Sequence, residues 1–574
     1  MNTSKFKSCL VKFSDEELKQ HLGQNLVDML IEWTPGNQPL FTKHKLADMI
    51  ITIYGINKLS DKDFRCSLLK RLSEKELLSF REALPRKFRE SNYKEVFPEI
   101  TKVAWGKNAV SVHLIKLLDI DEVVFSDNNT DELPREIIIA PERFYELLDY
   151  QFIIKQQTLN HLNSGVELNR MLIHMPTGTG KTKTAMHTII HNYNFNMQKS
   201  GLLIWMAHTT ELLHQAYETF VNVWKHIGKD EVNVYKLWGN FDVDITDESL
   251  NGFMFCGFQK LMAITKSNPG LFAKLIADCR LLIVDEAHKA AATETKKVIS
   301  DIMIKKVGME DRTLIGLTAT PGRNVADDTD IDRLVAMFDN KIITIDTETL
   351  NQINMTKIKA KNTEPERDII RFFQNRSILA RLNRERLTYP NGLTETELNK
   401  LRVTATSNGY EDFTRVFLEA IGRNKNRNMA ILNKLVQLNR EKIPTIVFAC
   451  SVEHGKLLSA ALTLEGVSNA CVFGDMNPVT RAQSIRRFKD RDDGLNILIN
   501  YEVLTTGFDA TNIRCVFITR PTQSVVLYSQ MIGRGLRGPK MGGNAECLLV
   551  DIDDNLKKYN ESMAFSYFDS YWSN

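Results

Sequence analysis

A glycine-rich segment has the composition of a loop that binds phosphate groups. The sequence MPTGTGKT, residues 175–182, follows an apolar run and precedes a helical pattern. Gly178 and Gly180 allow a tight turn that directs backbone N–H groups at phosphate oxygens. Lys181 would place a cation on the β- and γ-phosphates, and the Thr182 hydroxyl would be a ligand of Mg²⁺. The segment therefore predicts a nucleotide site.

The loop departs from the strict form of this motif at one position. Met175 stands where the first glycine is expected, whereas the core PTGTGKT is intact. The other two loop residues, Thr177 and Thr179, are also expected to bind the nucleotide. Because the strand and helix on either side are present, the prediction of nucleotide binding stands.

A second segment supplies carboxylates. LLIVDEAH, residues 281–288, is an apolar run that ends in Asp285 and Glu286. Asp285 fits a residue that holds Mg²⁺, directly or through water. Glu286 fits the general base that takes a proton from an attacking water. Together with Lys181, these groups predict the hydrolysis of ATP with Mg²⁺ as cofactor.

Such chemistry requires strands whose ends meet, and the chain has two sets of candidate strands. Five apolar runs in each half alternate with longer amphipathic stretches. The runs begin at Met171, Leu202, Phe253, Leu281 and Leu314, and then at Thr445, Ala470, Ile497, Cys515 and Cys547. Continuous apolar strands separated by helices indicate parallel sheets covered on both faces. We predict an α/β protein with two parallel-sheet domains in tandem.

Changes in the sequence pattern suggest the domain boundaries. Residues 1–135 are predicted to form a helical domain with its own core, and residues 136–330 the first sheet domain. Residues 331–440 are predicted to be a helical, basic insertion, and residues 441–574 the second sheet domain with a C-terminal tail. In the N-terminal domain, one apolar stripe at helical spacing is predicted from Leu18, Leu22, Leu26, Leu30 and Trp33.

The insertion carries an excess of positive charge. Residues 356–442 contain 18 Lys and Arg against 10 Asp and Glu, whereas the net charge of the whole chain is only +3. Two interpretations remain open. The charges belong either to solvated helix faces or to a surface that contacts the phosphate backbone of a nucleic acid.

Composition excludes several classes of protein. Hydrophobic residues make up 43% and charged residues 25%, as in a folded globular protein. No run of about 18 uncharged apolar residues predicts a membrane span. The N-terminus lacks the apolar core of a signal peptide, so we predict a cytoplasmic protein without a membrane partner. The eight cysteines form no CxxC pair, which argues against a zinc ribbon.

The order of the motifs resembles that of superfamily 2 helicases. PTGTGKT, DEAH and LTATP (residues 317–321) resemble motifs I, II and III, while VLTTGFDA (503–510) and QMIGRGLRG (530–538) resemble motifs V and VI. LLDYQ (147–151) and AHTTELLHQ (207–215) add to this likeness. It is closest to RadD-like DNA helicases and to the motor parts of type I and type III restriction enzymes. The resemblance implies two RecA-like domains and an ATP-driven DNA helicase or translocase.

The resemblance also assigns roles around the nucleotide. Arg534 and Arg537, with Gln530 in the same motif, would act from the second domain on the γ-phosphate held by the first. An arginine supplied in this way stabilises transition-state charge and can be worth about 10³–10⁵ in rate. Gly507 and Asp509 of motif V would sense the nucleotide.

Further roles that the resemblance implies lie between the nucleotide and the nucleic acid. Gln151 would read the adenine edge, and His288, Thr318 and Thr320 would couple the nucleotide site to the strand. Six residues in loops at strand ends would contact sugar and phosphate: His208, Thr209, Phe258, Gln259, Thr505 and Thr506. Contacts of this kind position a strand without reading its sequence.

Three alternatives remain open. The substrate could be RNA instead of DNA. The chain could also be the motor subunit of a restriction or anti-phage defence complex, with residues 1–135 as a docking module for a protein partner. Finally, it could be a nucleic-acid-binding scaffold with an inactive motor, which is disfavoured because Lys181, Asp285, Glu286 and both arginines are present. No nuclease constellation is evident, which argues against cleavage by this chain.

Overall fold

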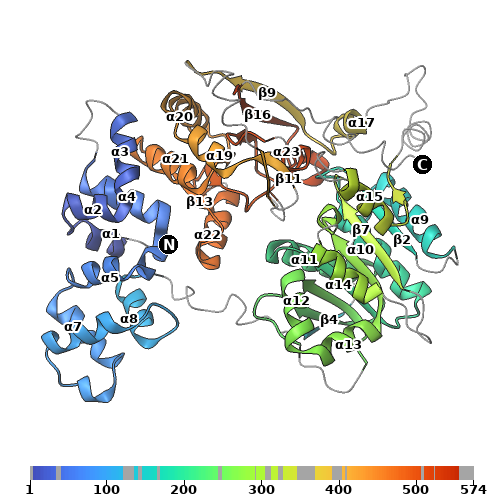
Figure 1. Ribbon diagram of the computed structural model, residues 1–574, viewed down its shortest axis with the longest axis horizontal. Coiled ribbons are helices and arrows are strands. Elements are labelled where there is room, and N and C mark those ends of the chain that lie inside the picture. Colours follow the sequence, from blue (N-terminus) through green and yellow to red (C-terminus); the bar gives the residue numbers. More distant parts are fainter. Residues whose placement is uncertain are drawn as a thin grey trace.

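The computed structural model describes most of the 574-residue chain. The described residues are 4–33, 41–120, 135–139, 145–164, 169–243, 249–290, 293–303, 312–320, 328–345, 369–390, 404–407, 410–490, 492–505, 510–522 and 524–554. Figure 1 shows a helical N-terminal domain at the left, a sheet domain at the right (domain 1) and a second sheet domain between and above them (domain 2).

The N-terminal domain is helical, as predicted. Its helices are α1 Ser4–Leu10, α2 Asp15–Leu22, α3 Gln24–Trp33, α4 Lys43–Tyr54, α5 Lys62–Leu69, α6 Glu74–Ser79, α7 Tyr93–Lys102 and α8 Ala109–Leu117. Ser14 caps α2, and Glu17 returns the bond by accepting from the Ser14 N–H at 2.9 Å. The predicted apolar stripe is buried, but Gly23 (φ +110°) divides it between α2 and α3.

Domain 1 contains an eight-stranded sheet with the order β1-β4-β5-β3-β6-β7-β2-β8. Its strands are β1 Arg135–Ile139, β2 Arg170–His174, β3 Leu202–Ala207, β4 Glu231–Leu237, β5 Gly252–Gly257, β6 Cys279–Asp285, β7 Thr313–Thr318 and β8 Ile342–Ile343. The five predicted runs are confirmed as β2, β3, β5, β6 and β7. Neighbouring strands are parallel except for β1 and β4.

Alternate residues of the strands face two different helix layers. Met171 and Ile173 of β2 pack with α9, α10 and α11, whereas Leu172 packs with the layer of α12 to α15. These helices are α9 Asp149–Leu162, α10 Lys181–His191, α11 Thr210–Ile227, α12 Phe258–Ser267, α13 Pro269–Asp278, α14 Thr293–Met303 and α15 Asp328–Met337. Because both faces are covered, the central strands are apolar along their whole length. The carboxyl ends of β2, β7 and β6 lie side by side.

The described part of residues 331–440 is not only helical, which corrects the prediction for this region. The strand β8 completes the sheet of domain 1. After it come α17 Ile369–Asn375, β9 Arg381–Leu387, a hairpin of β10 Thr404–Ser407 and β11 Tyr410–Phe413, then α19 Arg415–Gly422 and α20 Lys425–Arg440. The strand β9 joins the edge of the domain 2 sheet, where its polar sequence RLNRERL remains largely accessible.

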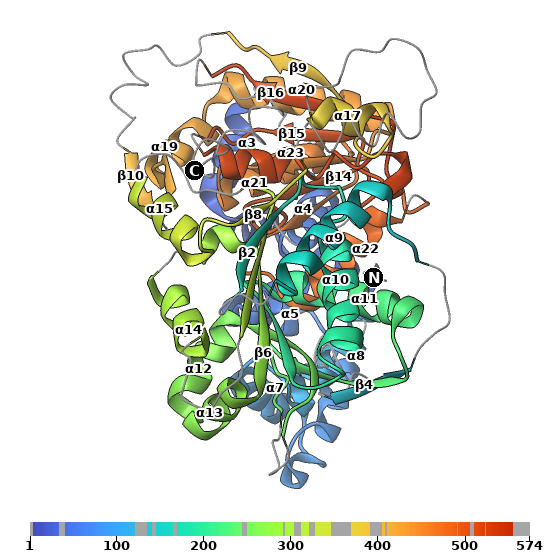
Figure 2. The ribbon, with the colours of Figure 1, turned by 90° about the vertical axis from the view of Figure 1, so that its right-hand side faces the viewer.

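Domain 2 contains a six-stranded sheet with the order β13-β14-β12-β15-β16-β9, and all of its pairs are parallel. The remaining elements are β12 Thr445–Phe448, β13 Asn469–Val472, β14 Ile497–Asn500, β15 Cys515–Ile518, β16 Glu546–Ile552, α21 Val452–Leu464, α22 Pro478–Lys489 and α23 Val525–Ile532. The five predicted runs of the second set are therefore confirmed. Figure 2 shows this domain above domain 1, and the predicted fold of two tandem RecA-like domains is confirmed.

The buried core of the N-terminal helices is continuous with the core of domain 2, whereas the sequence predicted a core confined to residues 1–135. Helix α4 packs on α21, and Ile50 of α4 belongs to the same buried cluster as Leu458 of α21. Lys45 Nζ also donates to the Leu464 carbonyl at 2.6 Å. The two domains form one packed unit, although domain 1 separates them in the sequence.

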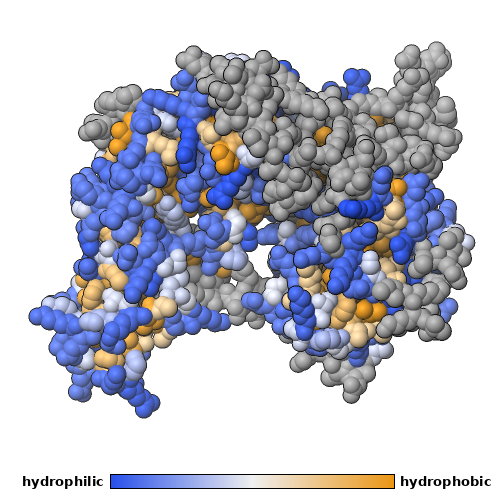
Figure 3. All heavy atoms as spheres, viewed as in Figure 1, coloured by the Kyte–Doolittle hydropathy of each residue, from blue (hydrophilic) through white to orange (hydrophobic). Residues whose placement is uncertain are grey.

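The surface in Figure 3 is mostly hydrophilic, with single hydrophobic residues scattered over it. In this view a gap separates the described atoms of the N-terminal helices from those of domain 1. Among the described residues, none of the helices has the combination of length and apolar character that crossing a bilayer requires.

Candidate nucleotide site

The phosphate loop begins where β2 ends, and two glycines shape it. Gly178 (φ +86°) and Gly180 (φ +82°) both lie in the left-handed region, which glycine adopts at little cost. Lys181 then opens α10, so the first amides of this helix face the loop. The Met175 N–H donates to the Thr318 carbonyl at 3.2 Å and ties the loop to the end of β7.

Two side chains of α9 support the loop. The Tyr150 hydroxyl and Gln151 Nε2 donate to the Thr179 carbonyl at 2.6 and 2.9 Å, and Gln151 Oε1 accepts from the Leu148 N–H at 2.9 Å. A Cβ at Gly180 would lie 2.3 Å from Gln151 Nε2, so this close packing requires glycine. The adenine contact of Gln151 stays a prediction. Its amide holds the loop, and the Thr179 side chain is fully buried.

Asp285 and Glu286 lie at the end of β6, beside the loop. Lys181 Nζ is 3.9 Å from Glu286 Oε1. Burial raises the pKa of Asp285, and the charge of Lys181 partly opposes this effect. Burial would also raise the pKa of Glu286, but the positive charges of Lys181, Lys289 and Arg534, together with the contact to His288, outweigh this effect, so that pKa is lower than usual. Glu286 is therefore ionised at neutral pH, the state that a general base requires.

His288 connects the acid pair to the predicted coupling residues. Its Nδ1 lies 3.3 Å from Glu286 Oε2 and 3.2 Å from Thr318 Oγ1, and the Thr318 hydroxyl donates to the Thr320 carbonyl at 2.7 Å. From domain 2, Gln530 Nε2 lies 3.4 Å from His288 Nε2. An amide nitrogen can only donate, so this contact places the histidine proton on Nδ1, facing Glu286.

Arg534 and Arg537 reach the site from domain 2, just after α23. The backbone between them and α23 touches the phosphate loop, because a Cβ at Gly533 would lie 2.5 Å from Thr177 Cγ2. Burial lowers the pKa of both guanidinium groups to about 10, and the charge of Glu286 opposes this effect at Arg534. Both side chains therefore remain cations at neutral pH.

One cavity of about 240 Å³ is lined by groups from both domains. Nine of the predicted residues line it: Thr177, Gly178, Gly180, Lys181, Thr182, Asp285, Glu286, Arg534 and Arg537. The predicted residues Thr506, Gly507 and Asp509 lie outside the described residues. The cavity joins a phosphate loop, two carboxylates and two arginines, which is the set of groups that phosphoryl transfer uses.

Other residues in the cavity wall lie outside the predicted set. Tyr145 and Met541 line it from domain 1 and domain 2, and Lys183 Nζ lies 3.7 Å from the centroid of the Tyr145 ring. Gln215, which closes the quoted segment AHTTELLHQ, lines it as well. Tyr145 and Met541 belong to none of the motifs, so no sequence pattern marks them.

Two protein families match the two sheet domains separately. "Type III restriction enzyme, res subunit" matches residues 144–323, and "Helicase conserved C-terminal domain" matches residues 427–538. The first match contains the phosphate loop and the acid pair, and the second contains both arginines. The chain belongs to the superfamily 2 helicases. As predicted, this helicase is related to the motors of restriction enzymes.

The helicase is similar to named proteins over about two thirds of its length. It is 25% identical over 407 residues to IRC3 of Saccharomyces cerevisiae, named as an ATP-dependent helicase, covering 68% of this chain and 49% of that one. It is 23% identical over 404 residues to helicase 22 of Sulfolobus islandicus filamentous virus, covering 69% and 63%. A solved fragment described as an HsdR subunit of a type I restriction enzyme from Vibrio vulnificus is 19% identical, with a TM-score of 0.47, covering 77% and 68%. The chain spans about half the length of the first relative.

Five of the six residues predicted to contact nucleic acid are described, and they follow the carboxyl ends of strands. In domain 1, the His208 and Phe258 rings follow the neighbouring strands β3 and β5 and stack with centroids 4.2 Å apart. Thr209 caps α11, and the Gln259 side chain is exposed on α12. In domain 2, the Thr505 hydroxyl donates a hydrogen bond to the Glu502 carbonyl at 2.6 Å. The nucleic-acid roles of these residues stay predictions.

Near Thr505, a wide cavity of about 580 Å³ opens at the ends of β12, β13 and β14. Its wall mixes charges, with Arg415 and Lys456 beside Glu453, Asp475 and Glu502. Like the nucleotide site of domain 1, this cavity lies at the carboxyl ends of parallel strands, where open α/β sheets commonly bind ligands.

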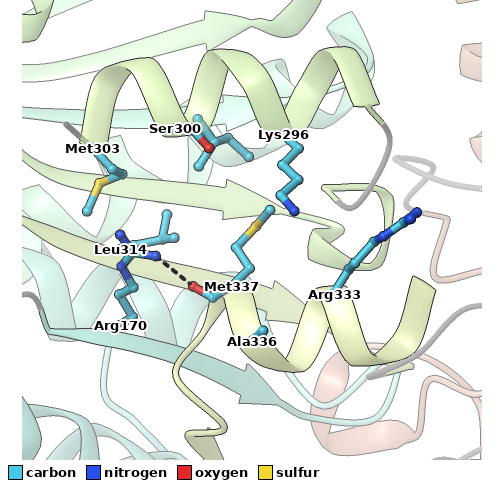
Figure 4. Close-up of a pocket in the computed structure, with 9 residues that line it drawn as sticks. Arg170, Lys296, Ser300, Met303, Leu314, Arg333, Ala336 and Met337 are labelled. Atoms are coloured by element: carbon cyan, nitrogen blue, oxygen red, sulfur yellow. Dashed lines mark hydrogen bonds between the residues drawn. The ribbon is translucent and has the colours of Figure 1, made fainter. Parts of the chain in front are cut away.

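A third cavity of the helicase, of about 340 Å³, is separate from the nucleotide site. Figure 4 shows it between α14 and α15, with Lys296 and Arg333 at its rim and Met337 at its centre. Arg170 and Leu314 line it from the starts of β2 and β7. It therefore lies at the opposite end of the sheet from the phosphate loop.

Proposed function

We propose that this helicase hydrolyses ATP with Mg²⁺ between its two RecA-like domains and uses the cycle to move along DNA. The observation that carries the proposal is the single cavity lined by Lys181, Asp285 and Glu286 from domain 1 and by Arg534 and Arg537 from domain 2. Neither domain alone supplies the full set, so turnover requires both.

The residues of the cavity fit a magnesium nucleotide. The left-handed glycines leave the loop open to phosphate oxygens, and Lys181 faces the same cavity. Thr182 and Asp285 provide the oxygen ligands that Mg²⁺ prefers. Bound Mg²⁺ would neutralise charge on the β- and γ-phosphates.

The chain's own groups then divide the work. Lys181 binds the phosphates, and the ionised Glu286 accepts a proton from the attacking water. Arg534 and Arg537 stabilise negative charge that develops on the transferred group. Because the arginines belong to domain 2, loss of the γ-phosphate removes a reason for the domains to stay closed. The resulting opening and closing is the proposed source of movement.

DNA is the proposed track because of the family that domain 1 matches. Domain 1 matches the family named "Type III restriction enzyme, res subunit", and the name indicates an enzyme that acts on DNA. The stacked pair His208 and Phe258 lies at the carboxyl ends of the neighbouring strands β3 and β5, and we propose that it contacts the nucleic acid, whether DNA or RNA. The match to the res subunit also supports a second candidate, a motor that works inside a restriction or defence complex. Co-purification of the full chain with a modification or nuclease subunit from its own host would support this candidate.

The test is ATP turnover measured with single-stranded DNA, duplex DNA or RNA at equal nucleotide concentration. We expect DNA to stimulate turnover more than RNA. A larger response to RNA would change the proposed track, and no turnover under any of these conditions would contradict the proposal.

Two substitutions test the assignment of the site. Lys181→Ala removes the cation that binds the phosphates, so we expect it to abolish turnover. Glu286→Gln removes the base but keeps the shape of the side chain, so ATP should bind while turnover falls about 10²–10⁴-fold. Equilibrium binding of a fluorescent ATP analogue and a phosphate-release assay separate these effects. Wild-type turnover in either variant would show that the site is assigned wrongly.

A further inference from the structure

A short segment between the sheet domains contacts several parts of the nucleotide site. It comprises residues 373–380, from the end of α17 to the start of β9. Figure 1 shows α17 between β9 and the upper end of domain 1. We call residues 373–380 the bridging segment. No helicase motif falls within it.

On the side of domain 1, the bridging segment contacts the start of α9. The ring of Phe373 packs edge-on against Tyr150 with centroids 4.8 Å apart, and Tyr150 holds the phosphate loop through its hydroxyl. Arg376 Nη2 forms an ion pair of 2.5 Å with Asp149 Oδ2, and both side chains are about four-fifths buried. Asp149 precedes Tyr150 directly, so both contacts act on the turn that supports the loop.

On the side of domain 2, the same segment pairs with the backbone of a proposed catalytic arginine. Leu379 forms an antiparallel bridge with Arg537, and backbone hydrogen bonds of 2.8 and 2.9 Å flank this bridge. A Cβ at Gly538 would lie 2.5 Å from the Ser377 carbonyl, so the two chains are in direct contact. The position of the Arg537 backbone therefore depends on the position of the bridging segment.

The bridging segment also touches the phosphate loop itself. A Cβ at Gly178 would lie 3.4 Å from Leu379 Cδ2 and 3.6 Å from Arg537 Cγ. Ile378, Leu379 and Ala380 are all buried. A buried and hydrogen-bonded backbone transmits displacement because the close packing around it leaves no room for independent movement.

We propose that Arg376 is a positioning residue that places Arg537 over the phosphate loop when the two domains close. The inference rests on the proposed function, because it assigns a role within that ATP site. Asp149 anchors Arg376 to domain 1, and three residues later Leu379 holds the Arg537 backbone in domain 2. The ion pair thus fixes the distance between the wall of the loop and the arginine of the opposite domain.

The experiment measures kcat and KM for ATP in the full-length chain carrying Arg376→Ala, Arg537→Ala or both. We expect Arg376→Ala to lower kcat about tenfold or more with little change in KM, since the ground-state contacts to the nucleotide remain. If Arg376 acts through Arg537, the double variant should be no slower than Arg537→Ala alone. Asp149→Asn should reproduce the loss caused by Arg376→Ala, and it provides an independent variant if Arg376→Ala does not fold.

The matched control is Arg487→Ala, which breaks an exposed ion pair with Asp493 in domain 2, 2.9 Å long. It should leave kcat unchanged. Wild-type kcat in Arg376→Ala, or losses that multiply in the double variant, would overturn the role of Arg376. Failure of the proposed function is a different result, because turnover of the wild type would then not depend on Lys181.

Discussion

Glu286 has an unusual backbone conformation for its residue type. Its φ of +51° lies in the left-handed region, which is uncommon for residues other than glycine, asparagine and aspartate. Strain of this kind persists where the surrounding structure imposes it and is frequent at functional sites. Here the turn aims the carboxylate between Lys181 and His288. The fold itself thereby positions the proposed general base.

Through Gln530, we expect domain closure to affect the orientation of Glu286. Gln530 Nε2, from domain 2, lies 3.4 Å from His288 Nε2 in domain 1. We expect Gln530→Ala to lower kcat about tenfold while nucleotide binding is unchanged, because only the orientation of His288 and Glu286 is lost. Turnover and analogue binding measure this. Gln437→Ala, on the exposed side of α20, is the control and should have no effect. An equal loss of binding would assign Gln530 to nucleotide affinity instead.

His454 predicts a pH dependence of stability. Its Nδ1 accepts from the Cys450 N–H at 3.1 Å, so Nε2 carries the proton and donates to Asn428 Oδ1 at 3.0 Å. Burial, helped by the charge of Arg427, lowers the pKa of His454 to about 3. The ordinary value in an unfolded chain is about 6.5. Between these two values the unfolded state binds a proton that the folded state does not, so acid destabilises the fold.

The free energy of unfolding should therefore fall as the pH drops below about 6.5, by up to about 1.4 kcal/mol per pH unit for this histidine. Above that pH its contribution is complete. Urea unfolding followed by circular dichroism, at several pH values between 5 and 8, measures the slope in the wild type and in the variant. His454→Gln should be less stable at pH 7.5 but should show a smaller slope. Parallel slopes in the two proteins would disprove the assignment.

At the scale of elements, α23 and the phosphate loop meet across the domain interface at one glycine. A Cβ at Gly533 would lie 2.5 Å from Thr177 Cγ2 and 2.8 Å from Thr177 Cβ. We expect Gly533→Ala to block full closure and to lower kcat about 100-fold, since a misplacement of about 1 Å can cost that much. Binding of ATP to domain 1 should persist. Gly106→Ala is the control, because no atom lies within 4 Å of its Cβ position. Wild-type kcat in Gly533→Ala would mean that turnover does not need this contact.

The elements that the sequence predicts are those that follow a local rule. The runs at Leu281 and Thr445 are apolar because both of their faces are buried, so these strands can be recognised from the sequence alone. The edge strand β9 carries three arginines and a glutamate and buries little, so it has no apolar run. The residues that line the nucleotide cavity from the motifs were predictable because they follow strands in short sequence patterns. Tyr145, Met541 and the bridging segment reach the site through long-range packing, which no local pattern encodes.

At the scale of the whole molecule, domain 2 occupies the centre. Ile446 and Phe448 of β12 belong to the hydrophobic cluster that includes domain 1, whereas Val447 between them belongs to the cluster of the N-terminal domain. One strand therefore serves two cores on its opposite faces. The apolar stripe of α2 and α3 correctly predicts burial, but it cannot say which domain covers it. When domain 2 moves relative to domain 1, the N-terminal domain should move with it.

This arrangement predicts that the N-terminal domain stays bound after the chain is cut. If a protease site inserted between residues 120 and 135 is cleaved, we expect the two fragments to co-elute in gel filtration. The reason is the shared core of α3, α4 and α21, together with bonds such as Lys45 to Leu464 and Asn57 to Asn477. A chain that lacks residues 1–120 should instead expose this apolar face and bind a hydrophobic dye, because burial of such surface contributes about 25 cal/mol per Å². If the cleaved fragments separate and the shortened chain binds no dye, domain 2 does not need the N-terminal helices, and this result would favour a docking role for residues 1–135.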